Sequence, residues 1–241
     1  MGKQRLDSLI VAKGLAESRT KAQALIMAGQ VVVAGKEGLK PGTALPESAV
    51  IKILETPQFV GRGGIKLAHA LDQFQIDVSG KVVGDIGAST GGFTDCLLQW
   101  GARRVYAVDV GYGQLDYRLR KDPRVVVLER VNARYQIPVS EKIALATIDV
   151  SFISVQKIIP SVATLMERSG YFIVLIKPQF EAERSEVGRG GVIKDSQLHA
   201  TVLGRFCRWA VANSLHLKGL VPSPILGSSG NQEFLLLLEL T

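Results

Sequence analysis

The sequence is poor in residues that hold metals or form disulfides. Its 241 residues include two cysteines, Cys96 and Cys207, and three histidines. The cysteines lie far apart, and neither a Cys-x-x-Cys pair nor a closely spaced histidine pair occurs. Zinc sites and disulfide frameworks depend on such spacings. We therefore predict no metal site, and we expect both cysteines to be small core residues in a reducing environment.

Long hydrophobic runs are also absent. The longest ones, near residues 171–176 and 234–238, have the length of strands. A membrane span needs about 18 or more apolar residues. The N-terminal residues, MGKQRLDSLI, show no apolar stretch followed by a small-residue cleavage site, as a secretory signal would require. The sequence therefore predicts a cytoplasmic protein that does not enter a membrane.

Charge of one sign is in excess. There are 29 lysines and arginines against 22 acidic residues, which gives a net charge of +7. Residues 1–60 alone carry a net charge of +3. A basic balance favours an anionic partner, most often a nucleic acid or an acidic membrane surface, although it can also serve solubility alone. Composition does not separate these alternatives.

The chain is expected to form two domains. In the first 60 residues, apolar residues at helical spacing predict a helix that Gly14 can end, and Ser18 is expected to cap a second helix. Short apolar segments at residues 31–34 and 50–54 predict strands. A stretch rich in proline and glycine, residues 56–64, then forms a junction. We predict two domains that meet at this junction, one over residues 1–60 and one over residues 61–241.

Apolar segments of strand length alternate with helical segments after the junction. Strands are expected at residues 81–86, 105–110, 125–128, 144–150, 171–177, 216–221 and 233–239. Helices are expected at residues 65–74, 92–100, 156–167 and 197–213. This alternation predicts an α/β fold of Rossmann-like type, with a largely parallel seven-stranded sheet covered on both faces. The short link between the last two strands predicts an antiparallel pair at one edge.

A glycine-rich turn follows the first of these strands and reads DIGASTGGF from Asp85 to Phe93. Glycines allow close backbone approach to a ligand, and the following helix offers free N–H donors. The spacing is neither that of a P-loop nor the dinucleotide pattern G-x-G-x-x-G. Asp109 ends the next strand, where an acidic residue can accept hydrogen bonds from the ribose hydroxyls of adenosine. An ordinary tight turn is the alternative.

This combination resembles the nucleotide-binding half of S-adenosylmethionine-dependent methyltransferases. The resemblance implies that the turn passes the methionine part of the cofactor, that Asp109 holds the ribose, and that Asn132 approaches the adenine edge. A loop-capping role for Asn132 is an equal alternative. The residues expected to bind the cofactor are Asp85, Gly87, Ala88, Ser89, Thr90, Gly91, Gly92, Phe93, Asp109, Val110 and Asn132.

Three charged residues, Asp149, Lys177 and Glu233, stand at expected strand ends, where α/β proteins place their sites. A fourth, Lys66, belongs to the helix expected just after the glycine-rich junction. Each alone has an ordinary explanation as a solvated lysine, an ion pair or a capping acid. Together they suggest a chemistry, because a lysine with a pKa lowered by burial and by a second ammonium can act as a base toward a ribose 2′-hydroxyl. The two carboxylates would orient the lysines and compensate their charge.

The order of these four residues resembles the K-D-K-E tetrad of FtsJ-type ribose 2′-O-methyltransferases. The motifs RGGIKL, DIGASTGGFTDCLL, VDVGYGQLDYRLR, DVSFIS, IKPQFE and GNQEF, after an N-terminal module of the ribosomal protein S4 type, resemble the TlyA family, which is also labelled hemolysin A. One departure is Gly61, where serine is expected. The resemblance covers nearly the whole chain and implies S-adenosylmethionine as methyl donor. It also implies cytidine ribose in ribosomal RNA, in one or both ribosomal subunits, as substrate.

The same resemblance assigns roles within the tetrad. Lys177 is the expected deprotonating residue, and Lys66 assists at the target hydroxyl. Asp149 is expected between the two lysines, and Glu233 would steady them. We expect the protein to act as a monomer.

Basic residues expected to contact RNA lie in both domains. The candidates are Arg5, Arg19, Lys21, Arg62, Arg184 and Arg189. Arg19 and Lys21 fall in the first turn of a helix, where cations oppose the helix dipole unless a phosphate lies nearby. Solvated surface charge is the alternative, and the loop with Arg184 is either a lid or disordered. Phe152 and Phe180 are expected either to stack on an extruded nucleotide or to belong to the core.

Three functions are compatible with parts of this pattern. The first is a ribosomal RNA 2′-O-methyltransferase. The second is a membrane-lytic hemolysin, which the absence of a signal peptide, a membrane span and a long basic amphipathic helix disfavours. The third is a ribosome-binding assembly factor without turnover, against which the intact tetrad and glycine turn count.

Overall fold

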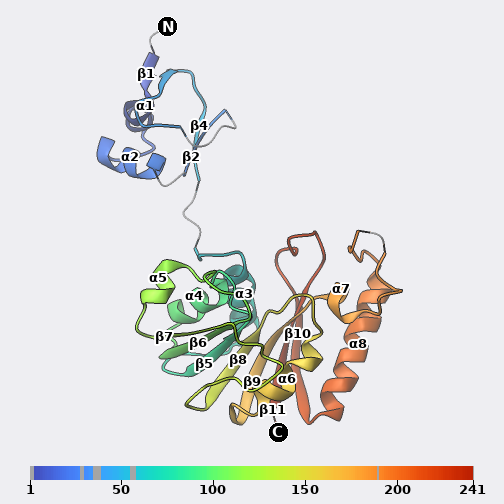
Figure 1. Ribbon diagram of the computed structural model, residues 1–241. Coiled ribbons are helices and arrows are strands. Elements are labelled where there is room, and N and C mark those ends of the chain that lie inside the picture. The colour runs from blue at the N-terminus through green and yellow to red at the C-terminus, as the bar shows by residue number, and fades with distance from the viewer. Residues whose placement is uncertain (1–2, 28–29, 35–38, 55–57, 189, 241) are drawn as a thin grey trace. The chain divides into compact units, whose positions relative to one another are not determined.

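The computed structural model describes residues 3–240 except 28–29, 35–38, 55–57 and 189. It divides into two compact units, Met1–Pro57 and Gln58–Thr241, which are considered separately (Figure 1). Among the described helices, none combines the length and apolar character that crossing a bilayer requires.

The first unit consists of two short helices and two small antiparallel sheets. Its elements are β1 (Lys3–Arg5), α1 (Leu6–Ala12), α2 (Arg19–Met27), β2 (Val31–Val33), β3 (Ala44–Pro46) and β4 (Ile51–Ile53). β1 pairs with β3, and β2 pairs with β4. Both expected helices are present, and the Ser18 hydroxyl accepts a hydrogen bond from the Lys21 backbone N–H at 3.2 Å, as an N-cap does. β1 and β3 were not expected, because strands of three residues have no recognisable period.

A buried carboxylate, Asp7, organises the basic side chains of this unit. Its side chain is fully buried and accepts hydrogen bonds from Arg5 at 2.9 Å, Gln23 at 2.8 Å and Arg19 at 3.2 Å. The Arg5 guanidinium, together with these other donors, holds the pKa of Asp7 far below its usual range. Asp7 therefore accounts for the position of Arg19 at a helix N-terminus, which had suggested a nearby phosphate. Arg5 and Arg19 remain about half exposed, at 51% and 55%, so RNA contact by these side chains stays a prediction.

The second unit is a seven-stranded sheet covered by helices. Its elements are α3 (Gly63–Phe74), β5 (Val82–Ile86), α4 (Gly92–Gln99), β6 (Arg104–Asp109), α5 (Tyr117–Lys121), β7 (Val125–Glu129), β8 (Ile143–Ile148), η1 (Val155–Lys157), α6 (Ile159–Ala163), β9 (Met166–Ile176), α7 (Pro178–Glu181), α8 (Ser196–Ala212), β10 (Leu215–Pro222) and β11 (Phe234–Leu240). The strand order is β10-β11-β9-β8-β5-β6-β7. β5 to β9 pair in parallel, whereas β11 is antiparallel to both of its neighbours. The predicted α/β fold is confirmed, and its antiparallel strand lies second from the edge.

Side chains on the two faces of this sheet enter two separate cores. Phe172 and Ile173 are adjacent in β9 and both fully buried, because successive strand residues point to opposite faces. Phe172 packs in the core beneath α6 and α8, and Ile173 packs in the core beneath α3 and α4. Figure 1 shows these two helix layers on either side of the sheet. Burial on both faces explains why the strands read as continuous apolar runs.

The prediction of a helix over residues 156–167 is wrong at its C-terminal end. The helical segment ends at Ala163, and the strand β9 already begins at Met166. Met166 pairs with Ile143 across an irregularity in the β8–β9 register. Its apolar side chain fits a helical period equally well, so local spacing alone does not distinguish the two structures.

Asp85 is a carboxylic acid buried beneath the carboxyl end of β5. It has no solvent exposure, and its Oδ2 accepts a hydrogen bond from the Thr94 hydroxyl at 2.6 Å. Burial raises the pKa of Asp85 to about 7, and the negative charge of Asp149 adds to the rise. The folded protein therefore binds this proton more tightly than the unfolded chain does.

We expect Asp85→Asn to change how stability depends on pH. The ordinary pKa of an aspartate is about 3.9. Because the folded value lies above it, the contribution of Asp85 to the free energy of unfolding falls as the pH rises from about 4 to 7. The wild type should lose stability relative to the variant over this window, by as much as about 4 kcal/mol at 1.36 kcal/mol per pKa unit. Urea unfolding at pH 5 and pH 8, followed by tryptophan fluorescence, measures the difference.

Asp72→Asn, at an exposed position of α3, is the matched control and should show no such pH dependence. An Asp85→Asn variant that differs from the wild type equally at both pH values would contradict the prediction.

Candidate active site

The loop after β5 passes directly against the end of β8. The Gly87 N–H donates to the Val108 carbonyl at 2.8 Å, and the Asp149 N–H donates to the Ile86 carbonyl at 2.9 Å. Gly87 has a φ of 89°, and a Cβ there would collide with the Asp149 carbonyl oxygen. Only glycine readily adopts this positive φ and also lacks the Cβ that would collide. The carboxyl ends of β5, β6 and β8 are thereby brought together at one edge of the sheet.

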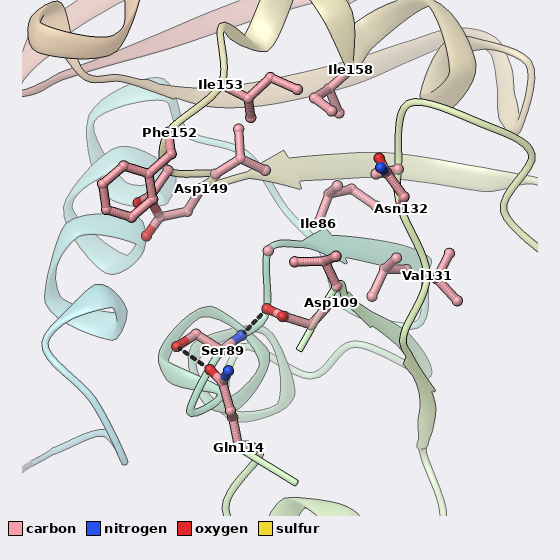
Figure 2. Close-up of a pocket in the computed structure, with 16 residues that line it drawn as sticks. Ile86, Ser89, Asp109, Gln114, Val131, Asn132, Asp149, Phe152, Ile153 and Ile158 are labelled. Carbon is pink, nitrogen blue, oxygen red and sulfur yellow. Dashed lines mark hydrogen bonds between the residues drawn. The ribbon is translucent and has the colours of Figure 1, made fainter. Parts of the chain in front are cut away.

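A pocket of about 470 Å³ opens at this edge. Its residues are Ile86, Gly87, Ser89, Val108, Asp109, Val110, Gln114, Val131, Asn132, Ala133, Asp149, Val150, Ser151, Phe152, Ile153 and Ile158. Figure 2 shows Ser89, Asp109 and Gln114 grouped on one side and the apolar Ile153 and Ile158 on the other. Asp109 Oδ2 accepts a hydrogen bond from the Ser89 N–H at 2.8 Å, and its Oδ1 accepts one from the Gly111 N–H at 2.6 Å. The pocket therefore has one polar and one apolar wall.

Five of the residues expected to bind a cofactor line this pocket. They are Gly87, Ser89, Asp109, Val110 and Asn132. The Asn132 side chain also accepts a hydrogen bond from the Arg134 N–H at 3.1 Å. Asn132 therefore caps its loop through its oxygen and is still part of the pocket, so the two explanations of this residue are compatible.

Six expected cofactor residues are not among the residues that line the pocket, namely Asp85, Ala88, Thr90, Gly91, Gly92 and Phe93. Asp85 points inward, toward Thr94. A Cβ on Gly91 would collide with Leu119, and one on Gly92 would come within 3.1 Å of the Gly61 carbonyl oxygen. These residues therefore shape the loop and its packing. Gln114, Ile153 and Ile158 also line the pocket but were not expected there, because single apolar and amide side chains have no pattern that distinguishes a ligand contact.

The structure arranges Lys66, Asp149, Lys177 and Glu233 as two ion pairs. Lys66 Nζ lies 2.5 Å from Glu233 Oε2, and Lys177 Nζ lies 2.6 Å from Asp149 Oδ1. Lys177 Nζ also donates to the Ser151 hydroxyl at 2.8 Å. Asp149 pairs with only one of the lysines, which differs from the expected position between them. Within the described residues, no group of three or more His, Cys, Asp or Glu side chains could hold a metal ion.

The antiparallel strand brings the second pair to the same edge. Phe234 of β11 pairs with Ile176 of the antiparallel strand β9. Glu233 directly precedes Phe234 and Lys177 directly follows Ile176, so the two residues lie at neighbouring positions. Lys66 reaches Glu233 from α3. All four side chains are largely buried, with at most 21% of any one exposed. Each buried charge has an opposite charge beside it, as stability requires.

A second pocket of about 490 Å³ adjoins the first. Lys177, Gln179, Phe180 and Glu233 contribute to its lining, and it shares Ser151 and Phe152 with the first pocket. Asp149 lines the first pocket, whereas its partner Lys177 lines the second. The Lys177–Asp149 ion pair therefore lies where two bound molecules could meet.

Phe152 stands between the two pockets in an unusual conformation. Its φ is 64°, a region that residues other than glycine rarely occupy, and 91% of the residue is exposed. Its ring centroid lies 5.1 Å from that of Phe180. Phe152 is thus not a core residue, and strained backbone of this kind is concentrated at functional sites.

The remaining predicted RNA contacts are Lys21 in the first unit and Arg62, Arg184 and Arg189 in the second. Arg62 donates to the Leu226 carbonyl at 2.7 Å, Lys21 and Arg184 are exposed, and Arg189 lies outside the described residues. The loop that contains Arg184 is fastened to α8, because Arg205 pairs with Glu186 at 2.6 Å. The roles of these side chains in RNA binding stay predictions.

Comparison with known proteins places both units in families. Residues 59–240 match the FtsJ-like methyltransferase family, and residues 4–51 match the S4 domain. The chain is 48% identical to YqxC of Bacillus subtilis, which is provisionally named an rRNA methyltransferase, over 98% of this chain and 86% of that protein. It is 43% identical to the 16S/23S rRNA (cytidine-2′-O)-methyltransferase TlyA of Mycobacterium tuberculosis, over 98% of this chain and 89% of TlyA.

A solved structure is similar over the full length. It is a protein of Streptococcus thermophilus with a provisional hemolysin name, 44% identical, with a TM-score of 0.76 over 100% of this chain and 90% of that one. The predicted resemblance to FtsJ-like and TlyA proteins is confirmed by these matches. The chain therefore belongs to the FtsJ-like methyltransferase family and carries an S4 domain on the N-terminal side of its methyltransferase unit.

Proposed function

We propose that this protein transfers a methyl group from S-adenosylmethionine to the ribose 2′-hydroxyl of a cytidine in ribosomal RNA. The observation that carries the proposal is the Lys177–Asp149 ion pair, which lies between two adjoining pockets. One pocket would hold the methyl donor and the other the target nucleoside. The name of the Mycobacterium tuberculosis relative supports the choice of cytidine and of ribosomal RNA. A cytoplasmic location would follow from this substrate.

The residues of the first pocket fit S-adenosylmethionine. Gly87 lines this pocket without a side chain, so the loop backbone can approach the methionine part closely. Asp109 would accept hydrogen bonds from the ribose hydroxyls, as acidic residues at this position of a Rossmann-like sheet do. Asn132 would meet the adenine edge, and Val131 and Ile158 provide apolar contact for the ring. When bound, the cofactor supplies an electrophilic methyl group on a sulfonium.

The residues of the second pocket would position the hydroxyl and receive its proton. Lys177, as the neutral amine, would accept the proton while the hydroxyl oxygen bonds to the methyl carbon and the carbon–sulfur bond breaks. Asp149 and Ser151 fix the position of Lys177 Nζ. Glu233 also lines the second pocket, and its ion pair with Lys66 would fix that part of the pocket wall. Alignment of the two reactants can supply about 7–11 kcal/mol of the rate acceleration.

The S4 domain would bind the RNA. Its basic side chains, among them Arg5, Arg19 and Lys21, would contact phosphates, and Arg62, Arg184 and Arg189 would do so from the second unit. Phosphate contacts position a protein on RNA without reading its sequence. The exposed ring of Phe152 would stack on the target nucleotide once that nucleotide leaves its helix.

Methylation can be tested directly with ribosomal subunits and radiolabelled S-adenosylmethionine. The wild type should label ribosomal RNA, and a map of reverse-transcription stops should locate the modified nucleotide. Lys177→Ala should lower kcat by about 100-fold or more, the usual contribution of a general base. Because Lys177 does not line the first pocket, the Kd of S-adenosylmethionine measured by calorimetry should stay within about twofold.

Lys81→Ala is the matched control, since Lys81 is exposed and precedes the amino end of β5. It should label RNA at the rate of the wild type. If Lys177→Ala also labels RNA at that rate, the assignment of the base is wrong.

The cofactor assignment has its own test. Asp109→Asn removes the charge that would hold the ribose hydroxyls, so the Kd of S-adenosylmethionine should rise about tenfold or more, as expected for hydrogen bonds to a charged group. Calorimetric titration of the wild type, of Asp109→Asn and of the exposed Asp77→Asn measures the change. An Asp109→Asn protein that binds the cofactor as tightly as the Asp77→Asn protein would refute this role.

A further inference from the structure

We propose that Gln179 binds the Watson–Crick edge of the target base. The inference rests on the proposed function, since it requires an RNA nucleotide in the second pocket. Gln179 lies in α7, two residues after Lys177, and both side chains line this pocket.

The side-chain oxygen of Gln179 has no hydrogen-bond partner among the described residues. This atom, Oε1, is buried. The other carboxamide of the pocket, that of Asn231, is fully used: Oδ1 accepts from the Ile193 N–H at 2.9 Å, and Nδ2 donates to the Gly191 carbonyl at 2.9 Å. A buried amide oxygen without a donor is unfavourable, so such atoms are rare in folded proteins. A bound ligand can supply the missing donor to Gln179.

The chemistry of an RNA nucleotide limits what that donor can be. Within a strand, the 3′ and 5′ oxygens are esterified, so the nucleotide has only the 2′-hydroxyl and the N–H groups of its base as donors. In the proposed reaction the 2′-hydroxyl is placed at Lys177. An N–H group of the base is then left for Gln179. The rings of Phe152 and Phe180 provide an aromatic surface beside it on which a base can stack.

A carboxamide can pair with either pyrimidine. Its oxygen can accept from the cytosine N4 amino group while its NH₂ donates to N3. Because no described protein group donates to its oxygen, the amide can also turn over to meet uracil O4 and N3–H. A carboxylate only accepts hydrogen bonds, so it can accept from cytosine N4 or uracil N3–H but repels the acceptor beside it, cytosine N3 or uracil O4. Gln179→Glu should therefore weaken the site for both pyrimidines.

The test compares the wild type, Gln179→Ala and Gln179→Glu on two substrates. These are ribosomal subunits with the mapped target nucleotide as cytidine or as uridine, and the readout is kcat/KM for methyl transfer. The wild type should use both within about tenfold, and Gln179→Ala should lose about tenfold on both. Gln179→Glu should lose about tenfold or more on both, within the range for one base contact. The Kd of S-adenosylmethionine, measured by calorimetry on the same preparations, should stay that of the wild type, which identifies any partly folded variant.

Gln73→Ala, at an exposed position of α3, is the control and should keep the rates and ratio of the wild type. An unchanged kcat/KM in Gln179→Ala and Gln179→Glu, with an active wild type, would overturn the inference and leave the proposed function intact. A wild type that methylates neither RNA would instead overturn the proposed function, and the inference with it.

Discussion

The close approach of Gly87 to the Asp149 carbonyl is the constraint on which the site depends. A side chain at residue 87 would push the loop after β5 away from the end of β8. The first pocket would then lose one wall, because Gly87 and Asp149 both line it. The position of Asp149 in turn determines where Lys177 is held, since the two side chains are paired. The first pocket and Lys177 are thus coupled through one backbone contact.

The arrangement of charge serves both stability and chemistry. Two lysines at the edge of a buried sheet would be strongly destabilising without partners. Asp149 and Glu233 each neutralise one of them at close range, and the carboxyls come from different strands. The ammonium groups are thereby kept in fixed positions without further hydrogen-bonding groups from the core. Lys177 remains at the wall of a pocket, where a substrate can reach it.

Sequence patterns predicted the fold well where many residues contribute and less well where one side chain decides. The alternation of strands and helices reflects burial on both sheet faces, which dozens of apolar residues record. Charged residues at strand ends could be grouped because the ends of parallel strands share an edge. The pairing partners within the tetrad, and the inward direction of Asp85, depend on the orientation of single side chains. Gln179 lies within the motif IKPQFE, but its role could not be predicted, since its side-chain oxygen accepts no hydrogen bond among the described residues.

The reversed direction of β11 has a consequence for how the enzyme tolerates damage. Because this strand runs against its neighbours, its first residues and not its last lie at the active edge, and Glu233 directly precedes it. β11 is also an inner strand, with β9 on one side and β10 on the other. A frameshift or premature stop just before residue 233 would therefore remove both the carboxylate that pairs with Lys66 and an inner strand of the sheet. Partly active truncation products are not to be expected from that region of the gene.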